Sequence, residues 1–265
     1  MKRNQLYLST IAPDSETVAS EYGFGLEIAE YCTAYLMDEQ FAETDLTVRR
    51  KLTNIPNRIL HGPFNELFPC AIDPLARKLA TYRYRQAIAL AKQYDAKKIV
   101  LHGGYNPKLY YPCWYTEQSI LFWKRFLEDV DSNQSFPNLD RENGSLIICL
   151  ENVLEETPDM LLDIVEGVND PRLKICLDVG HVNAYSSIPL VDWLKICAHR
   201  ISHFHLHNNT GEFDAHAPLH EGSIDMNELF RLIDQHCPLA TCTLEVMEAL
   251  SSARWLSEQK FIDID

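Results

Sequence analysis

Basic side chains are scarce in this sequence. It contains 24 lysines and arginines against 38 aspartates and glutamates, which gives a formal net charge of −14 at pH 7. Such a field repels the phosphate backbone of nucleic acids unless a local patch of opposite sign reverses it. Nucleic acid is therefore a disfavoured partner, and we expect a small-molecule partner instead.

Long apolar runs and paired cysteines are also missing. No segment reaches the length of a transmembrane helix, and the first residues, MKRNQLYLST, lack the apolar stretch of a signal peptide. The eight cysteines include no CxxC pair, and several lie within apolar runs. This pattern is typical of buried reduced thiols. We expect a cytoplasmic protein that does not contact membranes.

Short apolar runs alternate with longer amphipathic stretches along the whole chain. Eight such runs lie at residues 5–10, 25–31, 58–62, 98–103, 146–152, 173–181, 201–207 and 240–246. Most are continuously apolar, as expected for strands that are buried on both faces. Eight β/α repeats with right-handed crossovers close most simply into a barrel. The competing open, doubly wound sheet lacks support because no glycine-rich phosphate loop follows the first run.

Helical spacing of apolar residues fills the intervals between these runs. Asp73-Pro74 and Thr157-Pro158 predict helix starts, and the weaker candidates lie at residues 16–23 and 39–52 in the first two units. Apolar residues make up 46% of the chain, and no linker interrupts it. The sequence therefore predicts a single-domain α/β protein, a (β/α)8 TIM barrel over residues 1–265.

Residues that can bind metal stand at or near the ends of most predicted strands. They are His61, His102, Glu151, Asp178, His181, His205, His207 and Glu245, and the loop after the seventh strand adds Asp214 and His216. The C-terminal ends of barrel strands meet at one mouth. Any one of these residues has an ordinary hydrogen-bonded alternative. Gathering so many ionisable groups in one place is costly unless they neutralise each other or bind metal, so the set predicts a divalent-metal site.

Aromatic residues crowd the segment after the fourth predicted strand. Tyr105, Tyr111 and Trp114 are candidates for stacking on a substrate at the barrel mouth. Packing of the loop on its own hydrophobic cluster is an equal alternative. A contact between subunits of a homo-oligomer is another.

The strand-end motifs, taken together, resemble the xylose-isomerase-like TIM barrels, which include endonuclease IV and many sugar isomerases and epimerases. The motifs are His61-Gly-Pro, His102-Gly-Gly, Leu150-Glu151-Asn152, Leu177-Asp178-Val-Gly-His181, His205-Leu206-His207-Asn208 and Asp214-Ala-His216. Each motif is short, but all six occur in the family's order. The resemblance covers nearly the whole chain.

The resemblance to endonuclease IV implies up to three zinc ions, held by nine ligands. His61 and His102 would hold the first ion, and Glu151 would bridge it to a second. Asp178, His205 and Glu245 would complete the second site, while His181, Asp214 and His216 would hold the third. Two or three close ions suit the hydrolysis of a phosphoester.

The resemblance to the isomerases and epimerases implies a simpler centre. Glu151, Asp178, His205 and Glu245 would hold one Mn, Mg or Co ion, and Glu151 and Glu245 would also be the catalytic acid–base pair. In that case His181 would contact substrate. His207 and Asn208 are further candidates for substrate binding.

Departures from the endonuclease IV pattern bear on the substrate. Asn208 stands where an aspartate is usual, and His220 stands where a glycine is usual. Together with the acidic balance, they argue against DNA. Our main hypothesis is a hydrolase of a small non-DNA phosphoester. The alternative is a sugar or sugar-phosphate isomerase or epimerase, and the third is a non-catalytic ligand-binding barrel.

Overall fold

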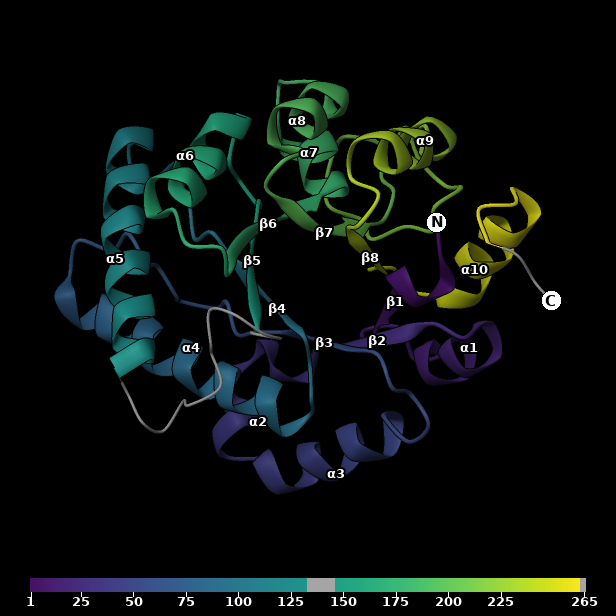
Figure 1. The fold of residues 1–265 in the computed structure, drawn as a ribbon, viewed down its shortest axis with the longest axis horizontal. Helices are drawn as coiled ribbons and strands as arrows, with labels where there is room; N and C mark the ends of the chain where they lie inside the picture. The colour runs from purple at the N-terminus through teal and green to yellow at the C-terminus, as the bar shows by residue number, and fades with distance from the viewer. Residues whose placement is uncertain (133–145, 263–265) are drawn as a thin grey trace.

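Eight parallel strands close into one barrel, and helices form a ring outside it (Figure 1). The structure is a computed structural model that describes residues 1–132 and 146–262. Each strand pairs with the next, and β8 pairs with β1. The strands are β1 (Leu6–Ser9), β2 (Gly25–Ile28), β3 (Arg58–His61), β4 (Lys98–His102), β5 (Ile147–Glu151), β6 (Leu173–Asp178), β7 (Ile201–Leu206) and β8 (Thr241–Leu244). The predicted TIM barrel is confirmed.

The helices follow the strands in the expected alternation. They are α1 (Ser15–Tyr22), α2 (Ala34–Asp38), α3 (Phe41–Lys51), α4 (Pro74–Gln93), α5 (Pro112–Ser132), α6 (Pro158–Val168), α7 (Val179–Tyr185), α8 (Leu190–Cys197), α9 (Met226–His236) and α10 (Ala249–Glu258), with short 3-10 turns at Arg3–Gln5 and Glu30–Cys32. The candidates in the first two units correspond to α1 and α3. The Asp73 side chain accepts a hydrogen bond from the Leu75 backbone N–H at 2.7 Å, as its predicted place at the start of α4 requires.

Two short helices differ from the sequence prediction. The sixth strand ends at Asp178 rather than near residue 181, because the Asp178 side chain accepts a hydrogen bond from the backbone N–H of His181 at 2.7 Å and begins α7 there. Helix α2 lies within a segment that showed no separate helical pattern. In the part of the chain that the structure describes, no helix is long and apolar enough to cross a membrane.

The interior of the barrel explains why the strand-end residues point toward its axis. A small apolar cluster, distinct from the main core between strands and helices, consists of Tyr7, Ile59, Val100, Cys149 and Cys176. Side chains alternate between the two faces of a strand, so residues two positions apart share a face. Four members of this cluster, Ile59, Val100, Cys149 and Cys176, are each followed two positions later by a candidate ligand. These ligands are His61, His102, Glu151 and Asp178. These four strand-end residues therefore lie on the same face of their strands as the apolar cluster.

The cysteines mostly follow the expectation of buried thiols. All eight are free, and six are buried. Cys32 is partly exposed and Cys113 is exposed, so the expectation fails at these two positions. Cys113 lies in the first turn of α5, where it faces solvent rather than the core.

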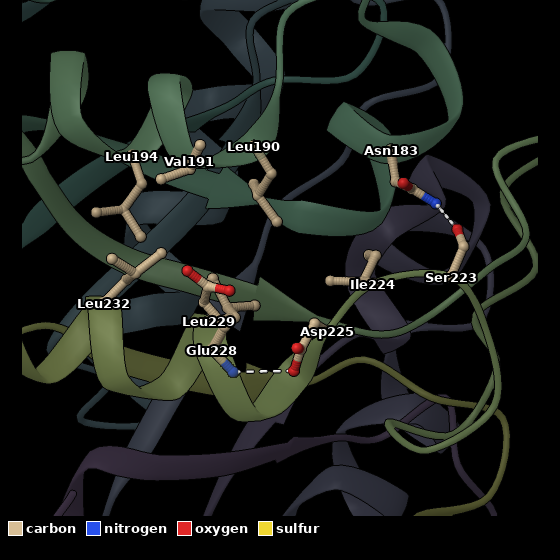
Figure 2. Close-up of a pocket in the computed structure, with 10 residues that line it drawn as sticks. All are labelled: Asn183, Leu190, Val191, Leu194, Ser223, Ile224, Asp225, Glu228, Leu229 and Leu232. Atoms are coloured by element: carbon tan, nitrogen blue, oxygen red, sulfur yellow. Dashed lines mark hydrogen bonds between the residues drawn. The ribbon is translucent and has the colours of Figure 1, made fainter.

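A cavity of about 280 Å³ lies on the outside of the barrel (Figure 2). Leu190 and Leu194 of α8 face Leu229 and Leu232 of α9 across it. Its acidic residue Asp225 accepts a hydrogen bond from the Glu228 backbone N–H and so caps α9. This cavity is separate from the polar centre at the barrel mouth.

Candidate metal centre

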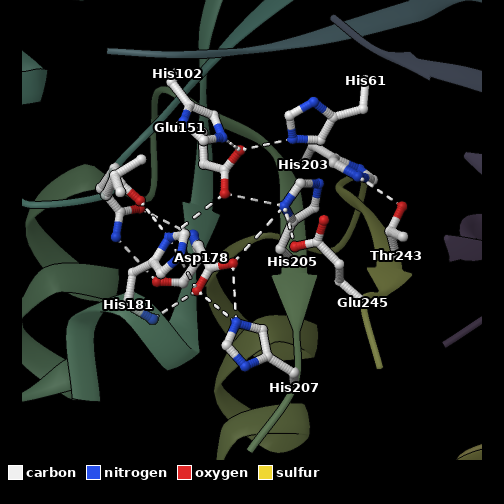
Figure 3. Close-up of polar contacts among 12 residues, drawn as sticks. His61, His102, Glu151, Asp178, His181, His203, His205, His207, Thr243 and Glu245 are labelled. Atoms are coloured by element: carbon white, nitrogen blue, oxygen red, sulfur yellow. Dashed lines mark hydrogen bonds and ion pairs between the residues drawn. The ribbon is translucent and has the colours of Figure 1, made fainter. Parts of the chain in front are cut away.

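The residues predicted as ligands meet at the C-terminal mouth of the barrel. Figure 3 labels all of them except Asp214 and His216. Four of them form the central cluster, in which each side chain offers an atom within 4.8 Å of those of the others. The central cluster consists of Glu151, Asp178, His205 and Glu245. All four side chains are buried. The Nδ1 atom of His205 lies 3.2 Å from Glu151 Oε1 and 3.1 Å from Glu245 Oε2, so the two glutamates flank one nitrogen.

Two further groups border the central cluster. On one side, His61 Nε2 and His102 Nε2 lie 3.3 and 3.5 Å from Glu151 Oε2. On the other side, Asp214 Oδ2 lies 3.2 Å from His181 Nε2 and 2.9 Å from His216 Nε2. All nine residues predicted as ligands are thus brought together, and their binding of metal stays a prediction.

Backbone carbonyls orient three of the histidines. A carbonyl oxygen only accepts, so a ring nitrogen bonded to it must carry the hydrogen. His61 Nδ1 donates to the Gly62 carbonyl at 2.9 Å. His181 Nδ1 donates to the Asn152 carbonyl at 2.8 Å, and His216 Nδ1 donates to the Glu245 carbonyl at 2.7 Å. In each ring the other nitrogen, Nε2, therefore faces the centre, where it is the atom that a metal ion would bind in place of a hydrogen.

His205 is oriented the opposite way, by a residue that the sequence analysis did not single out. Its Nε2 lies 3.0 Å from Glu27 Oε1, which leaves Nδ1 toward the central cluster. The Glu27 carboxylate is fully buried in the barrel, where Oε2 accepts from the Thr243 hydroxyl at 2.5 Å and lies 3.1 Å from His203 Nε2. Glu27 thus sits behind the central cluster, in contact with its histidine.

Electrostatics keep the carboxylates ionised. Burial by itself would raise the pKa of Glu151, but the imidazoles of His205 and His102 outweigh burial and hold that pKa well below its usual range. Burial is likewise outweighed at His216, where Asp214 and Glu245 raise the pKa to about 9. In the other direction, burial lowers the pKa of His102 to about 4, which favours its neutral form.

The donor set fits a divalent cation. The Oε2 atom of Glu151 is buried and makes no hydrogen bond within the described chain, although it lies between His61 and His102. Asp214 Oδ1 is buried and without a hydrogen bond in the same part of the molecule. Leaving charged oxygens unsatisfied is costly, and a cation bound among them would remove that cost. Carboxylate and imidazole donors suit Zn, Mn and similar ions.

A cavity of about 450 Å³ opens beside the centre. The candidate ligands that line it are His61, His102, Glu151, His181, Asp214, His216 and Glu245. The remaining lining residues are Ile11, Ala29, Cys32, Phe64, Val153 and Met247. The Phe64 ring stacks on the His102 ring, with centroids 4.2 Å apart. None of these six is predictable from the sequence, because single apolar residues after strands give no pattern.

The aromatic residues predicted to bind substrate lie outside the lining of this cavity. Tyr105 is buried against Tyr115, and the Trp114 Nε1–H donates to the Cys70 carbonyl at 2.9 Å. Tyr111 is 81% exposed. Tyr105 therefore packs within the segment, whereas Trp114 ties the segment to the residues around Cys70.

The polar candidates His207 and Asn208 also lie outside that lining. The His207 Nε2 atom contacts Asp178 at 3.1 Å. The Asn208 side chain donates to the carbonyls of Leu219 and Ile224 at 2.9 and 3.1 Å. Asn208 thereby holds the loop that carries Asp214 and His216, which is a structural task.

Comparison with known proteins agrees with the fold. Residues 19–259 match the model of the family described as xylose isomerase-like TIM barrel, which confirms the resemblance found in the sequence. A relative named uncharacterized protein MJ1311, from Methanocaldococcus jannaschii, is 30% identical over 189 residues, which cover 67% of this chain. The chain spans about 60% of the length of the curated relatives that it matches.

Solved structures share the whole barrel. One, described as a D-tagatose 3-epimerase-like protein, is 25% identical with a TM-score of 0.76, and the match covers 97% of each chain. Another, a Thermus thermophilus protein named TTHB071 and soaked with ZnCl2, is 22% identical with a TM-score of 0.73, covering 96% of this chain and 97% of that one. The second likeness shows the fold alone.

Proposed function

Because this chain belongs to the xylose isomerase-like TIM barrel family, we propose that it is a divalent-metal-dependent isomerase or epimerase of a small sugar-like hydroxy-carbonyl compound. One observation carries the proposal: the central cluster places four ligand atoms within 4.8 Å of one another, beside a cavity that Glu151 and Glu245 also line. The similarity to a structure described as a D-tagatose 3-epimerase-like protein supports this choice over phosphoester hydrolysis.

The ion would be held by Glu151, Asp178, His205 and Glu245. A divalent ion bound there supplies Lewis-acid stabilisation of the negative charge that develops on substrate oxygens. Its identity, whether Zn, Mn, Mg or Co, is part of the proposal to be tested. Asp178 is held in place for this task by the His181 backbone N–H and by Asn152, whose side chain accepts from the Asp178 N–H at 2.9 Å.

Glu151 and Glu245 would move the proton. Both carboxylates lie near His205 Nδ1, so they approach one point of the centre from two strands. One carboxylate removes a proton from the carbon beside the carbonyl, and the other returns a proton to the same carbon or its neighbour. Return to the opposite face of the same carbon gives an epimer, whereas return to the neighbouring carbon gives an aldose–ketose isomer.

Proton exchange with solvent tests this function directly. Metal-loaded protein is incubated in D2O with a panel of ketoses and aldoses, and proton NMR follows deuterium at the carbon beside the carbonyl. We expect deuterium incorporation with one class of substrate and its loss in Glu245→Gln. Release of phosphate from phosphoesters without any carbon-bound exchange would contradict the proposal.

A phosphoester hydrolase is the second candidate, and a specific observation favours it. Two additional clusters flank the centre, one of His61, His102 and Glu151 and one of His181, His207, Asp214 and His216. They would allow more than one ion. His216→Ala separates the two functions, because it should empty a site in a multi-metal hydrolase but only weaken an isomerase. Metal content per chain, measured beside turnover, distinguishes one ion from two or three.

A further inference from the structure

Five apolar side chains line the cavity together with the polar candidate ligands, and we call these five residues the ring. Five of the eight strands contribute one member each, from the residues just after the strand. They are Ile11, Ala29, Phe64, Val153 and Met247. Four are half-buried, and Met247 is 61% exposed. Apolar surface exposed in a concave site marks a surface that a ligand covers.

Polar side chains are almost missing from this ring. Apart from the candidate ligands, Cys32 is the only described lining residue with a polar side chain, and its thiol is already 3.2 Å from His61 Nδ1. Hydroxyl groups that lay against these five residues, rather than against the candidate ligands, would lose water without gaining side-chain partners. Unpaired buried hydroxyls are costly, so the ring disfavours a polyhydroxylated chain.

Lysine and arginine are missing as well. Neither is among the described residues that line the cavity, whereas three carboxylates and four histidines are. Lys51 lies near the ends of β1 and β2, but its ammonium is held by Glu30 at 2.9 Å and by the Thr10 carbonyl at 3.5 Å. Proteins bind phosphate groups with arginine, lysine or helix N-termini. The ring therefore offers a phosphate group neither lysine nor arginine.

We propose that the substrate carries no phosphate and presents an apolar segment to this ring, with its hydroxy-carbonyl oxygens at the central cluster. The proposal rests on the proposed function and specifies its substrate class. It distinguishes this site from one built for a sugar phosphate or for a fully hydroxylated sugar chain. The ring of five supplies the recognition, and the central cluster supplies the chemistry.

Hydroxamates of different side chain test the substrate class without an identified substrate. Each presents the same pair of oxygens to a bound metal, so differences in affinity report on the ring. The probes are acetohydroxamate, benzohydroxamate, threonohydroxamate and phosphoglycolohydroxamate, and calorimetry on the metal-loaded protein gives the affinities. We expect benzohydroxamate to bind roughly tenfold tighter than acetohydroxamate because its ring buries apolar surface. The polyhydroxy and phosphate-bearing probes should gain nothing over acetohydroxamate.

A charge placed in the ring should reverse the order. Met247→Lys should weaken benzohydroxamate several-fold and strengthen phosphoglycolohydroxamate. The matched control is Leu239→Lys, because Leu239 is 90% exposed in the connection between α9 and β8, at the opposite end of the barrel. That control should leave all four affinities unchanged.

The outcomes separate failure of the substrate class from failure of the function. If phosphoglycolohydroxamate or threonohydroxamate binds the unaltered protein as tightly as benzohydroxamate, the substrate class is wrong while the metal centre stands. If no hydroxamate binds although metal content shows a loaded centre, the proposed function itself fails. An unchanged order of affinities in Met247→Lys would also overturn the assignment of the ring.

Discussion

Glu27 is the residue that orients His205. The carboxylate lies behind the ring, 3.0 Å from Nε2, and the Thr243 hydroxyl and His203 fix its other oxygen. A carboxylate on the far nitrogen of a ligating histidine fixes the ring and raises its basicity. We expect Glu27→Gln to lower metal affinity by about 10- to 100-fold. Competition with a chelator of known affinity measures the change.

Two companion variants make this prediction specific. Thr243→Val removes one hydrogen bond to Glu27, so it should lower metal affinity in the same direction by a smaller factor. Val100→Ala removes apolar packing from the barrel interior without removing a hydrogen bond, and it should lower stability only. Equal metal affinity in Glu27→Gln and the unaltered protein would show that Glu27 has no influence on His205.

The candidate ligands could be predicted from the sequence, but Glu27, which contacts His205, could not. His205, Asp178 and Glu245 end apolar runs, and a polar residue at that place is visible in one sequence. Glu27 lies inside a run, and its pairing with His205 depends on closure of a barrel that brings β2 opposite β7. Glu27 also contacts His203, which lies 176 positions away in the sequence, so no local sequence pattern links the two residues.

Helix α7 depends on a glycine in its first turn. A Cβ atom on Gly180 would overlap the imidazole of His207, which lies against Asp178. We expect Gly180→Ala to destabilise the protein by roughly 1–3 kcal/mol, as overpacking does, and to weaken metal binding by displacing Asp178. Chemical denaturation and chelator competition measure the two effects.

A double substitution checks the cause of that destabilisation. In a His207→Ala background the overlapping ring is gone, so adding Gly180→Ala should cost far less stability than it does alone. Equal costs in both backgrounds would mean that the loss arises in the helix itself rather than in the contact with His207.

The contact between α3 and α4 has a predictable pH dependence. Asp45 of α3 is bonded by Arg49 at 2.8 Å and by the Tyr94 hydroxyl and the Gln93 amide at the end of α4. The Arg49 guanidinium in particular lowers the pKa of Asp45 below its usual value. A lowered pKa in the folded state adds stability above the unfolded pKa of about 4, and this stability disappears as the pH falls below it.

Asp45→Asn should therefore destabilise the protein at pH 7 by less than about 1 kcal/mol, because the pair is near the surface. The difference from the unaltered protein should shrink as the pH falls toward 3. Glu43→Gln, an exposed carboxylate on the same helix, is the control and should show little change. A destabilisation by Asp45→Asn that is constant across pH would contradict the electrostatic cause.

At the scale of elements, long periodic segments were predictable and short ones were not. Helices α4 and α6 each begin at a proline and have apolar spacing that one sequence reveals, although only Asp73 of the two predicted caps accepts a capping hydrogen bond. Helix α7 has seven residues directly after a strand, and its start depends on the Asp178 side chain rather than on periodicity. The aromatic segment was expected to be a loop up to residue 115, but α5 begins at Pro112 and places Trp114 and Tyr115 on a helix.

At the scale of the whole molecule, the barrel followed from the count and order of the apolar runs. Closure also explains the centre, because it brings the ends of β3 to β8 to one mouth. The chemical class did not follow from the sequence, since the same ligands suit hydrolysis and isomerisation. The choice of isomerisation draws on the lining of the cavity and on the similar structures.

The central claim is that Glu151, Asp178, His205 and Glu245 hold a divalent ion. Anomalous diffraction from crystals of the protein loaded with Mn²⁺ tests it most directly. We predict one strong anomalous peak bounded by atoms of all four residues, at the roughly 2.0–2.2 Å expected for carboxylate and imidazole ligands of such ions. The absence of a peak there, or peaks confined to the flanking clusters of His61 and His216, would contradict the account.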